Sequence, residues 1–265
     1  MRVRKTEISK AEGAIENADP LLLSKALLSG VDPNQRLENG ENLLHRACRP
    51  DAPVLVRILL DRGADANAKS RFGETPAFVA AENGRAGTLI ILGRAGADFN
   101  IPSTAGEFPI HRAAREGHCS AITVLLTFKA KLHAQTKNGG VTPLHLCASR
   151  GHVACAKTLI ECGARIDARE YDGTTPLISA VQGGQPSVAK MFLERGASVN
   201  ARDKEGRTPL IWAATKSDSP ALIKLLIRHG ANPKLTDHMG HSALSAARLL
   251  GHKAAEKALL KLIKK

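Results

Sequence analysis

A period of 33 to 34 residues runs through this 265-residue chain and constrains its fold more than any other feature. A glycine precedes a similar segment at positions 40, 73, 106, 140, 173, 206 and 240, with spacings of 33, 33, 34, 33, 33 and 34 residues. The segments read GENLLHRAC, GETPAFVAA, GEFPIHRAA, GVTPLHLCA, GTTPLISAV, GRTPLIWAA and GHSALSAAR. A second apolar run follows and ends near Gly-Ala-x-x-Asn, as in LLDRGADAN and FLERGASVN. A fixed period of this length is typical of stacked repeat units.

Each unit carries the signals of two short helices. Thr142, Thr175 and Thr208 each precede a proline, which predicts an N-cap followed by the first helical residue. The second apolar run has helical spacing, and the glycine after it predicts a left-handed helix end. Because a single unit does not bury its own apolar face, stability must come from stacking.

The period and the T-P-L-H-x-A pattern resemble the ankyrin repeat. The resemblance covers nearly the whole chain and implies an all-α ankyrin-repeat solenoid of about eight helix-turn-helix units with short β-hairpin tips. We expect a degenerate N-terminal capping repeat at 1–39, six ankyrin repeats at 40–239, and a C-terminal capping repeat with a basic helix at 240–265.

Three departures from the pattern stand out. Lys129 replaces the terminating glycine, which predicts a non-glycine residue with positive φ unless that helix ends differently. One extra residue lengthens the tip at Gly139–Gly140, and a second insertion lies in TKSDSPAL, residues 215–222. Insertions in repeat arrays fall in loops and sometimes mark the binding face.

The stretch VTPLHLCASRGH, residues 141–152, has the composition of an active site. A nucleophile at Cys147 needs a base within hydrogen-bond reach, and His145 and Ser149 lie nearby in sequence. The resemblance implies instead that His145 bonds the capping threonine and adjacent backbone, tying one repeat to the next. Cys147 occupies a position that holds a small core residue in other repeats. We therefore interpret the stretch as architecture and expect no enzyme.

A zinc site built from Cys147, His152, Cys155 and Cys162 is the other chemical alternative. Structural zinc sites favour close pairs of ligands, and the gaps here are eight and seven residues. Cys155 and Cys162 would lie roughly 10 Å apart along one helix, too far to share an ion. We expect neither a metal nor a cofactor, and no small-molecule substrate.

Charge is the composition feature that bears most on partners. The net charge is +13, which favours nucleic acid, anionic lipid or an acidic protein face. Residues 206–265 hold eleven basic and three acidic residues. In the last helix, lysines 253, 257, 261 and 264 line one face. That face is either the solvated side of a capping helix or a docking surface for an acidic partner, calmodulin or a membrane surface.

The resemblance implies that partners bind the hairpin tips and the exposed end of each first helix along a concave face. The predicted partner-binding residues are Arg71, Phe72, Lys137, Tyr171 and Lys204 in the tips, Arg49, Arg115, Arg150, Trp212 and Lys216 in the first helices, and Lys253, Lys257, Lys261 and Lys264 in the last helix. The aromatic members either anchor a partner or pack between repeats.

These observations predict a non-catalytic protein–protein interaction scaffold or adaptor, a subunit of a larger intracellular assembly that docks an acidic partner. The alternative is a component of an RNA–protein particle whose basic C-terminal repeats contact the phosphate backbone. The low aromatic content of 3% and the dispersed arginines argue against that alternative.

The expected location is cytoplasmic, with the nucleus or another reducing compartment as alternatives. The five cysteines are scattered and include no CxxC pair. No apolar run approaches the roughly 20 residues of a membrane helix, and the N-terminus has no signal-like apolar region. We therefore expect no membrane insertion.

Overall fold

The computed structural model describes residues 2–216 and 220–263. Within these ranges the chain forms sixteen α-helices and a single isolated β-bridge, between Thr236 and Ser242. The helices fall into two compact units, Met1–Lys137 and Asn138–Lys265. The predicted all-α solenoid of helix-turn-helix repeats is confirmed. No helix in the described ranges is long and apolar enough to cross a membrane.

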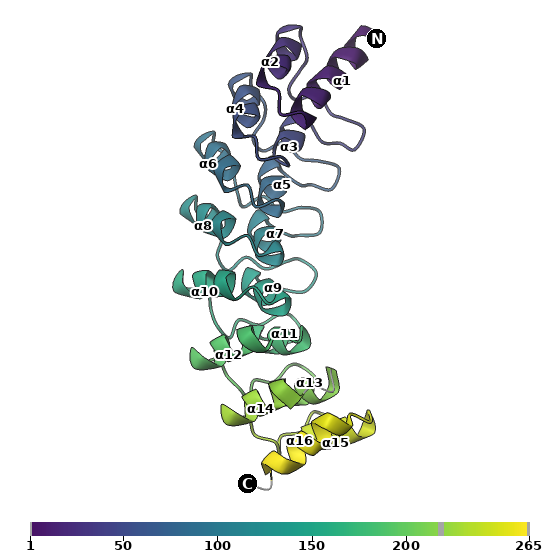
Figure 1. Ribbon diagram of the computed structural model, residues 1–265, viewed down its shortest axis with the longest axis vertical. Helices are drawn as coiled ribbons and strands as arrows, with labels where there is room; N and C mark the ends of the chain where they lie inside the picture. The colour runs from purple at the N-terminus through teal and green to yellow at the C-terminus, as the bar shows by residue number, and fades with distance from the viewer. Residues whose placement is uncertain (1, 217–219, 264–265) are drawn as a thin grey trace. The chain divides into compact units, whose positions relative to one another are not determined.

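The first unit contains four helix pairs: α1 (Arg2–Glu16), α2 (Pro20–Leu28), α3 (Leu43–Ala47), α4 (Pro53–Asp61), α5 (Pro76–Glu82), α6 (Ala86–Arg94), α7 (Pro109–Glu116) and α8 (Cys119–Thr127). The first helices of the pairs, α1, α3, α5 and α7, pack against one another in one row. The second helices, α2, α4, α6 and α8, form a parallel row beside it (Figure 1).

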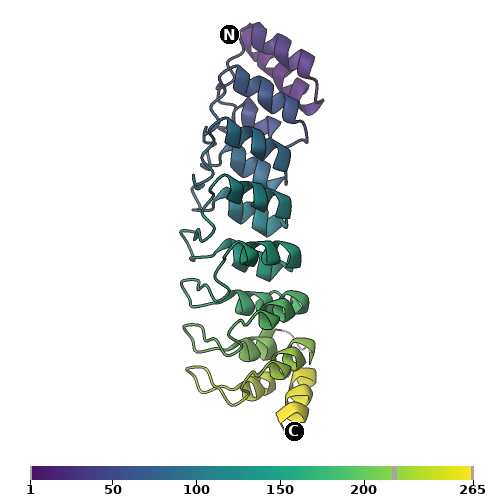
Figure 2. The same cartoon turned by 90° about the vertical axis from the view of Figure 1, so that its left-hand side faces the viewer.

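The second unit repeats this plan with α9 (Pro143–Arg150), α10 (Val153–Glu161), α11 (Pro176–Gln182), α12 (Pro186–Glu194), α13 (Pro209–Lys216), α14 (Pro220–Arg228), α15 (Ala243–Leu249) and α16 (Lys253–Ile263). Its first-helix row is α9, α11, α13 and α15, and its second-helix row is α10, α12, α14 and α16. The loops before α11, α13 and α15 project to the same side of this unit (Figure 2). Residues 217–219 of the predicted insertion lie outside the described residues.

The helix starts are those that the sequence predicts. The hydroxyl of Thr175 accepts from the backbone N–H of Ile178 at 3.4 Å, and that of Thr208 accepts from Ile211 at 3.3 Å. These bonds satisfy donors of the first turn that have no partner inside the helix. Helices α5, α7, α9, α11 and α13 all begin at a proline. The predicted N-caps at Thr175 and Thr208 are confirmed.

The core is aliphatic and rich in alanine, in keeping with the scarcity of aromatic residues. Ala113 and Ala114 in α7 are fully buried, as are Leu89 and Leu92 in α6. Small side chains at the paired alanine positions let neighbouring first helices pack closely, because the interaxial distance depends on the side chains at the contact. The core is therefore continuous along each unit, between its two rows of helices, and is not divided into a separate core for each repeat.

In the first three repeats, the asparagine that ends Gly-Ala-x-x-Asn ties one repeat to the next. In the first unit, the side-chain oxygens of Asn34, Asn67 and Asn100 accept from backbone N–H groups 31 residues later, at 2.7, 2.7 and 2.8 Å. Their amide groups also donate to the carbonyl that follows the next second helix. This accounts for the recurrence of Asn at positions 34, 67 and 100.

Lys129 follows α8 at the position of the terminating glycine. Its φ is +63°, so the predicted left-handed lysine is confirmed. A side chain in this region is uncommon because its Cβ crowds the backbone. The carbonyl of Lys129 still accepts from the amide of Asn100 at 3.1 Å, so the lysine preserves the repeat's inter-unit bond despite its strained backbone.

Candidate functional site

The residues that resemble an active site are used by the fold. The Nδ1 atom of His145 lies 2.8 Å from the hydroxyl of Thr142, and its Nε2 lies 3.1 Å from the carbonyl oxygen of Thr174 in the next repeat. His45 makes the equivalent contacts to Asn42 and to the carbonyl of Glu74. The expected inter-repeat tie is confirmed.

Burial makes this histidine and its cysteine neighbour unreactive. Desolvation lowers the pKa of His145 to about 4, against a smaller opposing effect of its bond to Thr174. Cys147 is completely buried, and burial raises the pKa of its thiol. Because both ring nitrogens of His145 are engaged, the imidazole is not available as a base for this thiol. Among the described residues, no group of three His, Cys, Asp or Glu side chains is arranged to hold a metal ion.

The tips present side chains that the fold does not bury. Phe72 is 63% exposed and Tyr171 is 55% exposed. Their backbones link successive tips: the carbonyl of Phe72 accepts from Thr104 at 2.8 Å, and the N–H of Tyr171 donates to Gly139 at 2.8 Å. The backbone is thus held in place while both rings stay more than half exposed, with the ring of Tyr171 lying against Gly140 of the preceding tip.

The basic tip residues are exposed as well. Lys137 and Lys204 form no ion pair with any described residue, whereas Arg71 donates to the carbonyl of Glu38 in the preceding tip at 2.8 Å. Within the described residues no ion pair therefore offsets the positive charge of the two lysines, and the role of all three residues in binding stays a prediction.

Two of the predicted first-helix arginines are neutralised within their own repeats. Arg49 forms an ion pair with Glu41, and Arg115 forms one with Glu107, in each case eight residues earlier. Burial would raise the pKa of the Glu41 carboxyl, but hydrogen bonds from Arg49 and Asn39 outweigh it and hold that pKa below its ordinary value. These ion pairs reduce the positive charge that Arg49 and Arg115 present to a partner.

The corresponding part of the second unit is more basic. Arg150 and Lys216 lie one position later in the repeat than Arg49 and Arg115. Both are exposed, and neither forms an ion pair with a described residue. The four predicted basic residues of the first helices therefore occupy two different helix positions, and of these four only Arg150 and Lys216 form no ion pair with a described residue.

Trp212 is partly exposed but firmly held. Its Nε1 donates to the buried carboxylate of Asp203 at 2.9 Å, and the guanidinium of Arg207 lies 4.1 Å from the centre of its ring. Arg207 also pairs with Asp203 at 2.9 Å. The indole is therefore pre-positioned by a bond at its edge and a cation at its face.

A cavity of about 470 Å³ lies beside Trp212 on the first-helix row, which sequence reasoning missed. It is lined by Val141, His145, Leu146, Ser149, Glu170, Ser179, Gln182, Gly183, Trp212 and Lys216. Ser70, Ser103, Asp203 and Asp237 stand at the position of Glu170 in other repeats and bond their own turns. In this repeat Asp172 caps the turn instead, by accepting from Thr174 at 2.9 Å. The sequence signal was a glutamate at a position where four other repeats have serine or aspartate.

The Glu170 carboxyl is the most perturbed acid in the described structure. Burial raises its pKa to about 7, the charge of Asp172 adds to the effect, and a hydrogen bond from Ser179 opposes it. No basic side chain among the described residues forms an ion pair with it. Around neutral pH this carboxyl is therefore easily protonated.

We predict that Glu170→Gln stabilises the protein increasingly as pH rises from 4.5 to 7, and by a constant amount above that. The folded-state pKa is raised, so between pH 4.5 and 7 the folded chain keeps a proton that the unfolded chain has lost, and stability falls over this window by an amount that glutamine does not lose. With allowance for solvent screening, the gain at pH 8 should be about 1 kcal/mol. Urea unfolding at several pH values measures it. Glu116→Gln, which removes an exposed carboxylate in α7, is the control. A stability gain for Glu170→Gln that does not change with pH would contradict the raised pKa of Glu170.

The last helix, α16, carries the basic face that the sequence predicts. Lys253, Lys257 and Lys261 are all exposed. Glu256, the acid within this helix, is engaged by Arg248 at 2.7 Å, so it does not offset the lysines directly. Lys264 lies outside the described residues.

Comparisons with known proteins agree with this architecture. A family model of ankyrin repeats, comprising three copies, matches residues 13–103, 110–203 and 197–265. The crystal structure of the human ASB11 ankyrin repeat domain is similar, with a TM-score of 0.76 and 29% sequence identity over 84% of this chain and 98% of that chain. No curated protein matches the chain. In all, 584 chains of solved structures match, so the fold alone does not select a partner.

Proposed function

Because the chain belongs to the ankyrin repeat family, a family of protein–protein interaction modules, we propose that it is a non-catalytic scaffold or adaptor that docks an acidic partner surface. The proposal includes membership of a larger intracellular assembly in the cytoplasm. The partner would contact the tips and the exposed ends of the first helices, with the lysines of α16 as an additional contact.

One observation carries the proposal: the exposed basic side chains of the second unit have few carboxylates to neutralise them. Arg150, Lys204, Lys216, Lys253, Lys257 and Lys261 are exposed and form no ion pair with any described residue. Uncompensated charge of one sign attracts a partner of the opposite sign and speeds its association. Phe72 and Tyr171 add the aromatic area that dominates many interfaces.

The test is affinity capture from cell extract with the full chain, with and without nuclease. A scaffold for proteins should retain its partners after nuclease treatment. A variant carrying Tyr171→Ser, Arg150→Gln and Lys204→Gln should lose them. The control, Leu21→Ser with Leu28→Ser, removes two exposed apolar side chains from α2 and should not. Loss of all partners on nuclease treatment would favour the RNA–protein alternative, and retention by the triple variant would contradict the proposed surface.

A further inference from the structure

A row of lysines runs along the second helices of the second unit. The fifth residue of α10, α12, α14 and α16 is Lys157, Lys190, Lys224 and Lys257 in turn. All four are exposed, and they are spaced by 33, 34 and 33 residues. In the first unit the same position holds Ser24, Arg57, Ile90 and Thr123. The row, named here the outer lysine row, is therefore a property of the second unit and not of the repeat.

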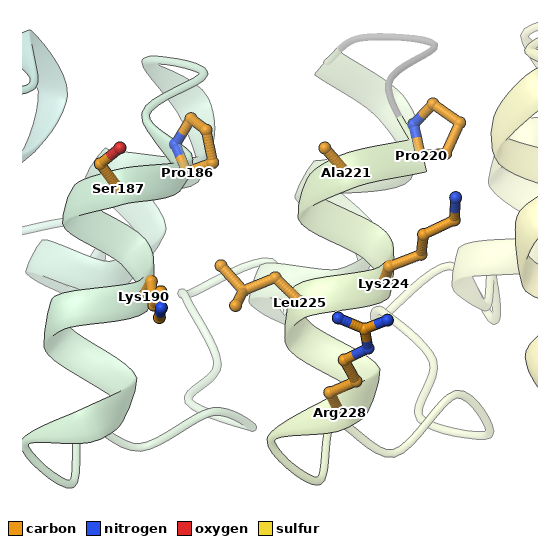
Figure 3. Close-up of a pocket in the computed structure, with 8 residues that line it drawn as sticks. All are labelled: Pro186, Ser187, Lys190, Pro220, Ala221, Lys224, Leu225 and Arg228. Carbon is orange, nitrogen blue, oxygen red and sulfur yellow. The ribbon is translucent and has the colours of Figure 1, made fainter.

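Between α12 and α14 the outer lysine row borders a groove of about 590 Å³. The lining residues are Pro186, Ser187, Lys190, Pro220, Ala221, Lys224, Leu225 and Arg228 (Figure 3). Leu225 extends from α14 toward α12 and gives the groove an apolar floor, while Lys190, Lys224 and Arg228 supply three cations. An apolar floor with cationic edges suits a ligand that is acidic and partly apolar.

Carboxylates on the same helices do little to neutralise this surface. Lys190 lies 3.7 Å from Glu194, but both side chains are more than half exposed, so the pair contributes little. Glu161 pairs with Arg195 at 3.7 Å instead of Lys157. Lys224 and Arg228 form no ion pair with a described residue. The ninth residue of the helices changes from Glu161 and Glu194 to Arg228 and Lys261, so positive charge increases toward α16.

The spacing of the outer lysine row restricts what can bind all of it. Packed helices lie about 8–10 Å apart, so successive lysines recur at about that distance. A polyproline II helix has three residues per turn and rises about 3.1 Å per residue, so every third side chain recurs at about 9 Å on one face. Four lysines then match four carboxylates in a segment of about ten to twelve residues.

We propose that the outer lysine row and its groove bind an extended acidic protein segment in polyproline II conformation, with a carboxylate at every third residue and small apolar residues between. The inference rests on the proposed function for the acidity of the partner. It adds a second surface, on the second-helix row, that is distinct from the tips and first helices. Each carboxylate meets one lysine, and the intervening apolar residues contact Leu225 and the prolines.

Two synthetic peptides test the spacing. One has twelve residues with Glu at every third position in a Pro-Ala frame, and the other has the same composition with its four Glu contiguous. Fluorescence anisotropy with the full chain should show the periodic peptide binding at least about fivefold tighter, with both affinities falling as salt is added. Equal affinity, or no binding of the periodic peptide, overturns the proposal. Tighter binding of a twelve-nucleotide single-stranded RNA also overturns it.

Charge-removing variants test the location. Lys190→Gln, Lys224→Gln and Arg228→Gln together should weaken binding of the periodic peptide by about tenfold, since several exposed charge pairs are lost. The matched control removes three exposed cations from the first unit, by Arg57→Gln, Arg62→Gln and Arg94→Gln, and should change affinity less than about twofold. Similar losses in both variants mean that net charge alone matters, which contradicts the proposal. Thermal unfolding confirms that both variants are folded.

The failures of the two proposals are distinguishable. If the groove variant loses the peptide while the tip variant still captures its partners, the outer lysine row binds as proposed and the first-helix surface is wrong. If the groove variant keeps the peptide while the tip variant loses partners, the outer surface is wrong and the proposed function stands.

Discussion

Replacement of Gly183 by alanine is expected to destabilise the second unit by about 2–3 kcal/mol. Gly183 follows α11, and a Cβ there would lie 2.1 Å from the carbonyl oxygen of Ser149 and 2.9 Å from its carbonyl carbon, in α9. Its φ of −77° suits any residue, so the cost is steric and not conformational. Because the obstructing atoms are backbone, relief requires α9 and α11 to separate, and that disturbs the packing of the whole first-helix row.

Gly87→Ala is the matched control for this prediction. Gly87 lies in α6, and a Cβ there meets nothing within 4 Å. Alanine should stabilise that helix by about 0.5–1 kcal/mol, because glycine loses more backbone freedom on folding. The midpoints of denaturant unfolding of the two variants should therefore shift in opposite directions from that of the parent chain. Equal shifts, or an unchanged midpoint for Gly183→Ala, would mean that the two helices are not in this close contact.

The second large effect is a loss of stability in acid that originates at His145. Its folded-state pKa is about 4, below the ordinary value of 6.5, because burial disfavours the charged ring. Between pH 6.5 and 4 the unfolded chain binds a proton that the folded chain does not. The stabilisation is therefore complete above pH 6.5 and is lost as pH falls to 4, by about 3 kcal/mol for this one group. His45, whose pKa burial also lowers, adds to the loss in the same direction.

His145→Gln separates this effect from general acid denaturation. The variant should be less stable than the parent chain at pH 7.5, because the bonds to Thr142 and Thr174 are weakened or lost. The difference in free energy of unfolding should shrink steadily toward pH 4. His229→Gln, at an exposed position after α14, should show no such change. If the difference in free energy of unfolding between His145→Gln and the parent chain stays constant from pH 7.5 to 4.5, the lowered pKa of His145 is refuted as the origin of the acid effect.

Much of the fold follows from local sequence. The capping Thr175, the helix-starting Pro176 and the left-handed Lys129 were all predictable, because capping and turn conformation depend on atoms within a few residues. The tie from His145 to the next repeat was implied by the resemblance to ankyrin repeats, and the structure places its partner at the carbonyl of Thr174, 29 residues later.

The candidate surfaces were predicted less completely. The sequence placed Phe72 and Tyr171 in the tips but left open whether they pack between repeats, and the structure leaves both more than half exposed. The neutralisation of Arg49 by Glu41 was missed, because the two lie eight residues apart across a turn and meet only when the tip folds back on its helix. The cavity beside Glu170 was missed for a similar reason, since three neighbouring first helices contribute to it.

The sequence by itself determined the period, the helix starts and ends, and the position of every lysine in the outer row. Only the tertiary structure decided which charges remain uncompensated and where the stack leaves a groove or a cavity. The physical reason is that helix caps depend on residues close in sequence, and the repeat depends only on regular spacing along the chain. The energy of a charge depends instead on its burial and on all charges nearby. Those surroundings exist only once neighbouring repeats have packed, as around Glu170 and between α12 and α14.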